Sequence, residues 1–97
     1  MNLSGQQRRH LRGLGHHLDP VVQVGNQGIT DNLVAAVDQA LLDHELIKIR
    51  VGEHAPEDRK TVAKALAERT GSEEVQVLGR TILLYRAHPE KPKLKLP

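Results

Sequence analysis

The sequence predicts a single α/β domain, a two-layer sandwich in which three helices pack on a four-stranded mixed sheet. Two observations lead to this fold class. Stretches with helical apolar spacing alternate with short β-rich stretches, in the order α-β-α-β-α-β-β. The last two β-rich stretches are separated by only two residues, which is typical of a hairpin. With 97 residues the chain has room for one such domain, expected over 1–86, and for a basic tail of prolines and lysines over 87–97.

The first expected helix follows Ser4, which has the spacing of a capping box with Gln7. Arg8 and Arg12 are four residues apart, so we expect them to share the outer face of the helix, with Arg9 beside them. The inner face is expected to carry the residues that recur at helical spacing, which are Leu3, Gln7, Leu11, Leu14 and Leu18.

A short strand over 21–24 is expected next, and it ends at the loop 25–28, which reads Gly-Asn-Gln-Gly. The second helix begins after Thr30, whose hydroxyl can cap it. Its acidic residues lie mostly outside the apolar stripe, which comprises Leu33, Val34, Val37, Ala40 and Leu41.

Residues 46–51 alternate as a strand does, with branched apolar side chains on one face and Lys48 and Arg50 on the other. A third helix is expected over 58–70, and Gly71 after it supplies the C-terminal stop. Two right-handed crossovers would make the first three strands parallel.

The last two strands are expected to form an antiparallel hairpin around Gly79 and Arg80, a pair that suits a type II′ turn. The turn sets the register and pairs Leu78 with Thr81, Val77 with Ile82 and Val75 with Leu84. This register directs Val75, Val77, Ile82 and Leu84 toward the core, and the opposite face receives Glu74, Gln76, Leu83 and Tyr85.

The composition excludes several classes of protein. There is no cysteine, which excludes disulfides and thiolate metal sites, and no apolar run approaches the ~20 residues that a membrane helix needs. The first seven residues lack the apolar stretch of a secretory signal, and we expect a cytoplasmic protein. The six histidines include no HxxxH pair, and the two serines fit cap or turn roles. We therefore expect no metal, no other cofactor and no enzymatic activity.

The charges are segregated along the chain, although the net charge is only +2. Residues 1–18 carry three arginines and no acid, whereas residues 19–47 carry five acidic residues and neither lysine nor arginine. Residues 48–97 carry eleven lysines and arginines against seven acidic residues. This pattern predicts a polarised molecule with one surface for a polyanion, although solvated surface charge is the plain alternative.

The loop 25–28 is the most informative segment for function. Its two glycines let the chain turn tightly and let a phosphate approach the backbone without a Cβ in the way. The N–H groups of such a turn, with those that open the next helix, can form a cradle for an anion, as GxxG loops do in KH domains. By itself the pattern also fits a plain turn.

The chain also carries a series of short motifs, which are Asn2-Leu3-Ser4, Leu11 to Leu14, Pro20-Val21-Val22, the loop 25–28, Asp43-His44-Glu45-Leu46-Ile47-Lys48, Val75-Gln76-Val77-Leu78-Gly79-Arg80 and Leu83-Leu84-Tyr85-Arg86. In this order and spacing, over residues 2–97, the sequence resembles the CRM domain family (chloroplast RNA splicing and ribosome maturation), specifically its stand-alone bacterial YhbY-type members. The resemblance implies a non-catalytic RNA-binding protein linked to maturation of the large ribosomal subunit. It also implies a fold similar to the C-terminal domain of a bacterial translation initiation factor. Related loops often hold a basic residue between the glycines, whereas this loop has two uncharged amides.

We therefore expect RNA contacts from the loop and from basic residues that neutralise phosphates, with affinity that falls steeply as salt rises. The candidates are Gly25, Asn26, Gln27, Gly28, Arg8, Arg9, Arg12, Lys48, Arg50, Arg80 and Tyr85, with Lys60, Lys64 and the tail lysines as second choices. The single aromatic residue, Tyr85, can stack on a base or simply cover the sheet. Because recognition of single strands relies on aromatic platforms, structured RNA read by its shape and backbone is favoured over sequence-specific recognition of a single strand.

The alternative is a protein-interaction module that docks on a ribosomal protein through the acidic second helix. The placement of the basic residues discriminates between the two hypotheses. One continuous surface of Arg8, Arg12, Lys48 and the loop 25–28 favours RNA, whereas scattered charges together with an exposed, apolar-flanked second helix favour the alternative. The small size indicates a monomer.

Overall fold

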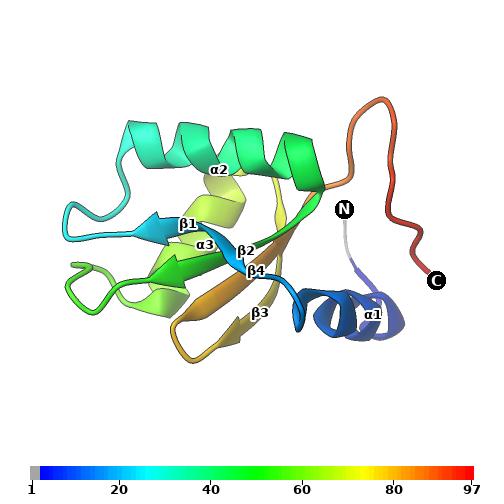
Figure 1. Cartoon of the computed structure of the whole chain (residues 1–97), viewed down its shortest axis with the longest axis horizontal. Helices are drawn as coiled ribbons and strands as arrows, with labels where there is room; N and C mark the ends of the chain where they lie inside the picture. The colour runs from blue at the N-terminus through cyan, green and yellow to red at the C-terminus, as the bar shows by residue number, and fades with distance from the viewer. Residues whose placement is uncertain (1–2) are drawn as a thin grey trace.

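The computed structural model describes residues 3–97, and Figure 1 shows the arrangement of its helices around one sheet. In chain order the elements are α1 (Gly5–Gly15), β1 (Pro20–Val24), α2 (Asp31–His44), β2 (Leu46–Val51), α3 (Arg59–Thr70), β3 (Glu73–Leu78) and β4 (Thr81–Tyr85). The strand order is β1-β2-β4-β3, with β1 parallel to β2 and β4 antiparallel to both of its neighbours. The predicted α/β class, element order and mixed sheet are confirmed.

Local sequence explains where the helices begin and end. The Ser4 hydroxyl accepts a hydrogen bond from the Gln7 backbone N–H at 3.1 Å, and the Gln7 side chain accepts one from the Ser4 N–H at 3.0 Å. This completes the predicted capping box of α1. Thr30 caps α2 and Asp58 caps α3, and Gly71 ends α3 in the left-handed conformation with a φ of 65°.

The main core lies between the sheet and the layer formed by α2 and α3. Its buried residues are Val24, Val37, Leu41, Ile47, Ile49, Val51, Val62, Ala63, Leu66, Ile82 and Leu84. The alternation of β2 holds as predicted, so Lys48 and Arg50 lie on the opposite face of the sheet. None of the helices within residues 3–97 is long and apolar enough to cross a membrane.

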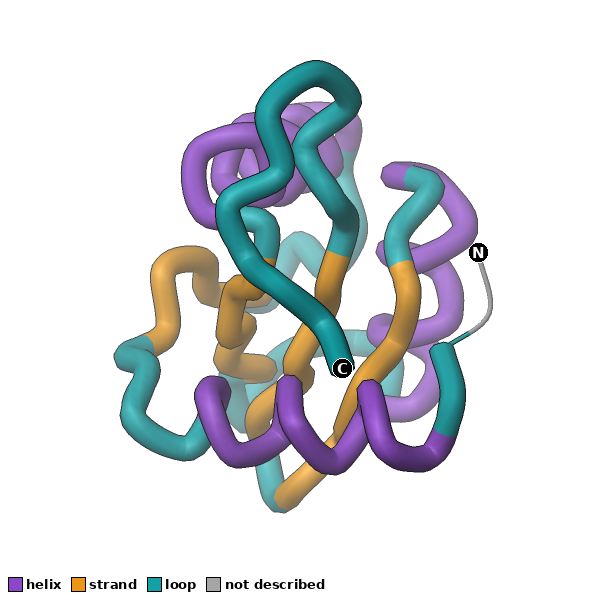
Figure 2. The backbone as a smooth tube through the Cα atoms, turned by 90° about the vertical axis from the view of Figure 1, so that its right-hand side faces the viewer, coloured by secondary structure: helices purple, strands orange, loops and turns teal. Residues whose placement is uncertain are grey.

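Helix α1 and the C-terminal segment 87–97 partly cover the opposite face of the sheet. They add to the two layers formed by the sheet and by α2 and α3. Figure 2 shows this segment passing in front of the strands toward α1. The covered cluster comprises Leu3, Leu11, Leu46, Val75, Leu83 and Tyr85, with Leu94 and Leu96 of the segment packed against it. The basic tail expected from the sequence thus contributes apolar contacts as well as charge.

The β3–β4 hairpin departs from the predicted register at one point. The two pairs next to the turn form as expected, Leu78 with Thr81 and Val77 with Ile82. The predicted pair of Val75 with Leu84 is wrong, because a bulge between Glu74 and Gln76 places Leu84 opposite Glu74. The extra residue turns Val75 to the other face, where it is 6% exposed. Its apolar partners there are brought by α1, which alternation along a hairpin cannot anticipate.

Glu45 holds the C-terminal segment against the domain. This residue follows α2 with a φ of 64° and is 1% exposed. Its carboxylate accepts hydrogen bonds from the backbone N–H groups of His88, Lys93 and Leu94 at 2.8, 2.7 and 2.9 Å. Burial raises the pKa of the Glu45 carboxyl, but these hydrogen bonds outweigh burial and hold the pKa below its ordinary value of 4.5.

Candidate nucleic-acid interface

The two glycines of the β1–α2 loop have different surroundings. Gly28 is buried with a φ of 69°, and a Cβ there would lie 2.5 Å from a carboxylate oxygen of Glu57 and 2.8 Å from the Pro56 ring. The Gly28 N–H donates to the Gly25 carbonyl at 3.0 Å, so it already closes the turn. Gly25 is exposed with open space where a Cβ would be. A phosphate can therefore approach the backbone at Gly25 and not at Gly28.

A hollow of about 530 Å³ lies beside this loop, and three separate segments line it. Its lining residues are Gln23, Gly25, Asn26, Arg50, Val51, Gly52, Glu53, His54 and Arg80. Backbone hydrogen bonds fix the segments to one another. The Gly52 N–H donates to the Val24 carbonyl at 2.9 Å, and the Val51 N–H donates to the Arg80 carbonyl at 2.7 Å. The hollow is thus built into the ends of β1, β2 and the hairpin.

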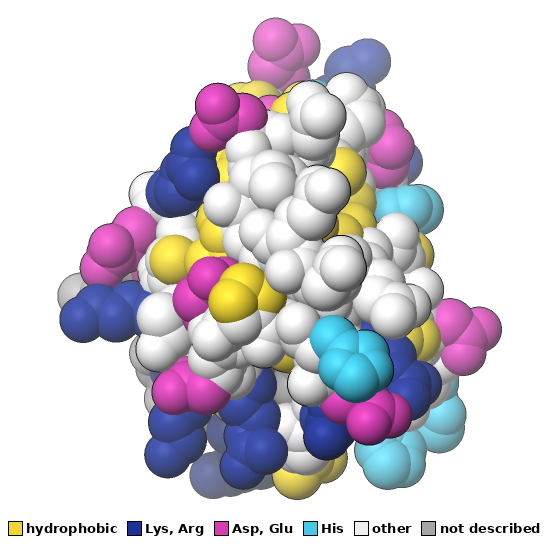
Figure 3. All heavy atoms as spheres, turned by 90° about the vertical axis from the view of Figure 1, so that its left-hand side faces the viewer, with side chains coloured by type: hydrophobic (Ala, Val, Ile, Leu, Met, Phe, Trp, Pro, Cys, Tyr) yellow, Lys and Arg dark blue, Asp and Glu magenta, His cyan; other side chains and the backbone are white. Residues whose placement is uncertain are grey.

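The polar side chains that face this hollow are free to bind a ligand. Across residues 3–97, no hydrogen bond or ion pair engages the side chains of Gln23, Asn26, Arg50 or Arg80. Arg50 and Arg80 are exposed. Figure 3 looks onto this end of the molecule, and most of the lysine and arginine side chains in view lie on its lower half. Two free guanidinium groups beside an open glycine can bind phosphate oxygens.

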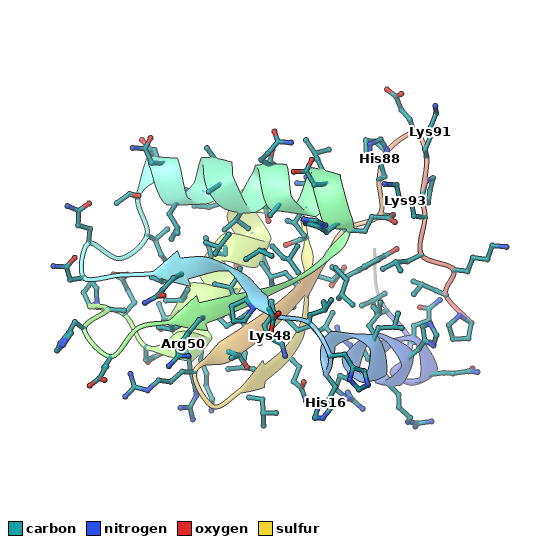
Figure 4. All side chains as sticks on the ribbon, in the orientation of Figure 1. His16, Lys48, Arg50, His88, Lys91 and Lys93 are labelled. Atoms are coloured by element: carbon teal, nitrogen blue, oxygen red, sulfur yellow. The ribbon has the colours of Figure 1, made fainter. Side chains whose placement is uncertain are left out.

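Lys48 extends this basic surface along β2. It lies two residues before Arg50 on the same face of the strand and is half-buried. Lys48 shares a smaller depression with Gly15 and His16, at the C-terminal end of α1. Figure 4 shows His16, Lys48 and Arg50 along this side of the molecule. Hence the loop, the two arginines and Lys48 form one surface that reaches the end of α1.

The arginines of α1 do not join the hollow. The Arg8 guanidinium donates to the backbone carbonyl of Glu74 and is half-buried, so the prediction that Arg8 lies on the outer face is wrong. The reason is that α1 packs on the sheet through the side that carries Arg8, Leu11 and Gly15. Arg9 is exposed and Arg12 half-buried, and both lie on a helix at the other end of the molecule from the loop 25–28 (Figure 1).

Tyr85 has the alternative role that the sequence left open. It is 2% exposed beneath α1 and the C-terminal segment, so its ring cannot stack on a base in this structure. Burial, assisted by the negative charge of Glu45, raises the pKa of the Tyr85 phenol above 10.0. Tyr85 is therefore part of the packing, and its placement among the RNA contacts is corrected.

Sequence reasoning missed Gln23 and His54 as lining residues of the hollow. Gln23 had a usable signal, because strand alternation from Val24 directs it away from the core and toward the face of Arg50. The register confirms that Gln23 is opposite Arg50. His54 had no such signal, since it lies in the irregular β2–α3 loop, whose path depends on tertiary contacts.

Known proteins match this chain over nearly its whole length. The family model of the CRS1/YhbY (CRM) domain matches residues 3–86. YqeI of Bacillus subtilis (strain 168), named a probable RNA-binding protein, is 42% identical over 95 residues, which cover 98% of this chain and 99% of the relative. An RNA-binding protein of Haemophilus influenzae is 39% identical over 95 residues, which cover 98% of this chain and 95% of the relative.

A solved structure extends the likeness to three dimensions. The solution structure of the hypothetical protein SAV1595 from Staphylococcus aureus, described as a candidate RNA-binding protein, matches with a TM-score of 0.83 and 42% identity. The match covers 99% of this chain and all of the other. Family model, relatives and fold agree over nearly the whole length, and the chain therefore belongs to the CRS1/YhbY (CRM) domain family.

Proposed function

We propose that this protein is a non-catalytic, cytoplasmic and monomeric RNA-binding protein that grips structured ribosomal RNA and acts in maturation of the large ribosomal subunit. One observation carries the proposal. Gly25 and Asn26 of the GxxG loop line the same hollow as Arg50 and Arg80, whose charges are not used within the described chain. Relatives that are named RNA-binding proteins support RNA as the ligand.

The geometry favours contact with the RNA backbone. Each arginine or lysine that neutralises a phosphate releases counterions, and this release supplies much of the affinity for a polyanion. Arg50, Arg80 and Lys48 lie on one surface with the exposed Gly25, where a phosphate meets no side chain. With Tyr85 buried, residues 3–97 expose no Phe, Tyr or Trp ring, which supports recognition of structured RNA by its shape and phosphates.

The placement of the basic residues meets the criterion for RNA only in part, because Lys48 and the loop 25–28 share one surface whereas Arg8 and Arg12 lie apart from the hollow. The alternative, docking on a ribosomal protein through the acidic helix α2, is weakened by a separate observation. Two of the acidic residues of α2 are already paired within the chain. Asp31 accepts from Arg69 at 2.9 Å, and Asp38 accepts from Arg86 at 2.6 Å. These ion pairs leave α2 with less free negative charge for a basic partner than its sequence implies.

The test is binding to a structured fragment of large-subunit ribosomal RNA across a salt series. We expect a steep loss of affinity with salt in the intact protein. The double variant Arg50→Ala, Arg80→Ala should reduce the slope of log affinity against log salt by between about 1 and 2, as expected for two lost phosphate contacts. Gly25→Glu should also weaken binding, because it places a carboxylate where a phosphate approaches. Gly25→Ala, which leaves the loop uncharged, is its matched comparison.

Matched controls separate the site from general charge loss. Lys64→Ala removes an exposed positive charge from α3, on the layer that covers the other face of the sheet, and should change the slope less than either hollow arginine. Unchanged binding by the folded double variant would place the RNA site elsewhere. No binding by the intact protein would favour the protein-docking alternative. For the role in maturation, the protein should co-sediment with precursors of the large subunit and not with mature ribosomes.

A further inference from the structure

We propose that the hollow beside the loop 25–28 is a subsite for one unpaired nucleotide of the RNA, whose base edge is bound by the amides of Gln23 and Asn26. The inference rests on the proposed function and deepens it, because it names the RNA feature that the site accepts. Contacts with phosphates alone require neither a hollow nor neutral amides inside it. This site has both the hollow and the neutral amides.

The size and shape of the hollow suit a single nucleotide. Its volume of about 530 Å³ lies within the range of roughly 300–1,000 Å³ typical of small-ligand sites. It opens between three chain segments, the β1–α2 loop, the β2–α3 loop and the β3–β4 hairpin. A paired base is held in its helix by stacking and by its partner, so only a base that has left the helix can enter such a space.

The two amides are placed to read the edge of a base. Gln23 lies on the sheet, with its Nε2 atom 3.6 Å from the position of a Cβ at Gly52, and Asn26 is contributed by the exposed loop. An amide offers one donor and one acceptor side by side, which match the N6 and N7 atoms of adenine. Neither side chain has a partner within the described residues, so a base need not displace an existing contact.

Arg50 and Arg80 complete the subsite. A guanidinium plane can stack on an unpaired base or bind the phosphate beside it, which compensates for the absence of an exposed Phe, Tyr or Trp ring among residues 3–97. Glu53 is the one carboxylate among the described lining residues, so the two arginines leave the hollow with a net positive charge. The Arg80 backbone is held by the Val51 N–H, which fixes the origin of its side chain.

The experiment compares, by fluorescence anisotropy at low salt, three stem-loop RNAs that share the same paired stem. One stem is fully paired, the second has a single unpaired adenosine, and the third has an abasic nucleotide in its place. The abasic RNA keeps the bend and the extra phosphate but has no base to bind. We expect the intact protein to bind the unpaired adenosine at least about fivefold more tightly than either control RNA, the lower end for one bidentate amide–base pair.

Variants then assign the preference to the hollow. Gln23→Ala and Asn26→Ala should each reduce the preference for the unpaired adenosine while leaving affinity for the paired stem unchanged. Gln6→Ala, an exposed amide on α1, is the matched control and should keep the preference. Both lining side chains are exposed, so the variants are expected to fold, which thermal unfolding checks.

The outcomes distinguish this inference from the function on which it rests. Equal affinity for the adenosine and abasic RNAs would overturn the nucleotide subsite and leave RNA binding intact. A preference that survives both amide variants would also overturn it. Failure of the intact protein to bind any of the three RNAs would overturn the inference together with the proposed function.

Discussion

Gly25 and Gly28 are the same residue type in one loop, and the structure gives them different tasks. Gly28 adopts a φ of 69° against Pro56 and Glu57, so it is required by the fold. Gly25 has open space around it and no such backbone requirement, so it is available to a ligand. A sequence pattern that treats both glycines alike cannot separate these roles.

The first prediction concerns Gly28→Ala. We expect it to lower the free energy of unfolding by about 1–3 kcal/mol, because alanine is strained in the left-handed region. Gly25→Ala should stay within about 0.5 kcal/mol of the intact protein, as an exposed substitution without a contact. Urea unfolding of both variants measures the difference. Equal stability of the two would show that the loop does not depend on the conformation of Gly28.

At the scale of elements, local signals predicted more than long-range packing did. Ser4, Thr30 and Gly71 mark helix ends through contacts within a few residues, and all three act as the sequence indicates. The bulge at Val75 depends instead on α1, some sixty residues earlier in the chain. Within the candidate site, the exposure of Arg50 and Arg80 followed from strand alternation and turn position. The inward turn of Arg8 did not, because a backbone carbonyl of β3 attracts it.

The hydrogen bonds that Glu45 accepts from the C-terminal segment give the second prediction. Oε1 accepts from Lys93 and Leu94, and Oε2 accepts from His88, so both oxygens are acceptors. Glu45→Gln would turn one acceptor into an NH₂ donor that faces a backbone N–H. We expect a loss of about 1.5–3 kcal/mol in unfolding free energy, the range for a hydrogen bond to a charged group. Glu90→Gln, in the exposed part of the segment, is the control and should cost little.

The same hydrogen bonds predict that the stability of the protein depends on pH with a definite sign. The folded-state pKa of Glu45 lies below 4.5, so the unfolded chain binds more protons as the solution is acidified. The stabilisation is present above about pH 4.5 and is lost as the pH falls through the lower, folded-state pKa. Urea unfolding at a series of acidic pH values should show this fall in the intact protein. A fall in stability of the same size in Glu45→Gln would show that other carboxylates cause it.

At the scale of the whole molecule, the two faces of the sheet have separate tasks. One face builds the main core with α2 and α3. The other face is divided between a packed half under α1 and the C-terminal segment, and an open half that carries Arg50 next to the loop 25–28. The division places the basic surface on a rigid support, because both halves share the strands β2 and β4.

Tyr85 lies in the packed half of this face, so its titration can test the division. Burial and the nearby Glu45 raise its pKa above 10.0, so the folded protein keeps the phenol proton where the unfolded chain loses it. Stability from this group is therefore lost as the pH rises above about 10. The chain has one tyrosine and no tryptophan, so an alkaline absorbance titration reports on Tyr85 alone.

We expect the titration midpoint of Tyr85 to lie above 10.0 in the intact protein and to move toward 10.0 in Glu45→Gln. The substitution removes the charge near the phenol and loosens the segment that covers it, and both changes favour the phenolate. Lys64→Ala, on the other layer, should leave the midpoint unchanged. A midpoint at 10.0 in the intact protein would mean that water reaches the ring. Tyr85 would then be available to stack on RNA, and the open half of the sheet would extend beneath the C-terminal segment.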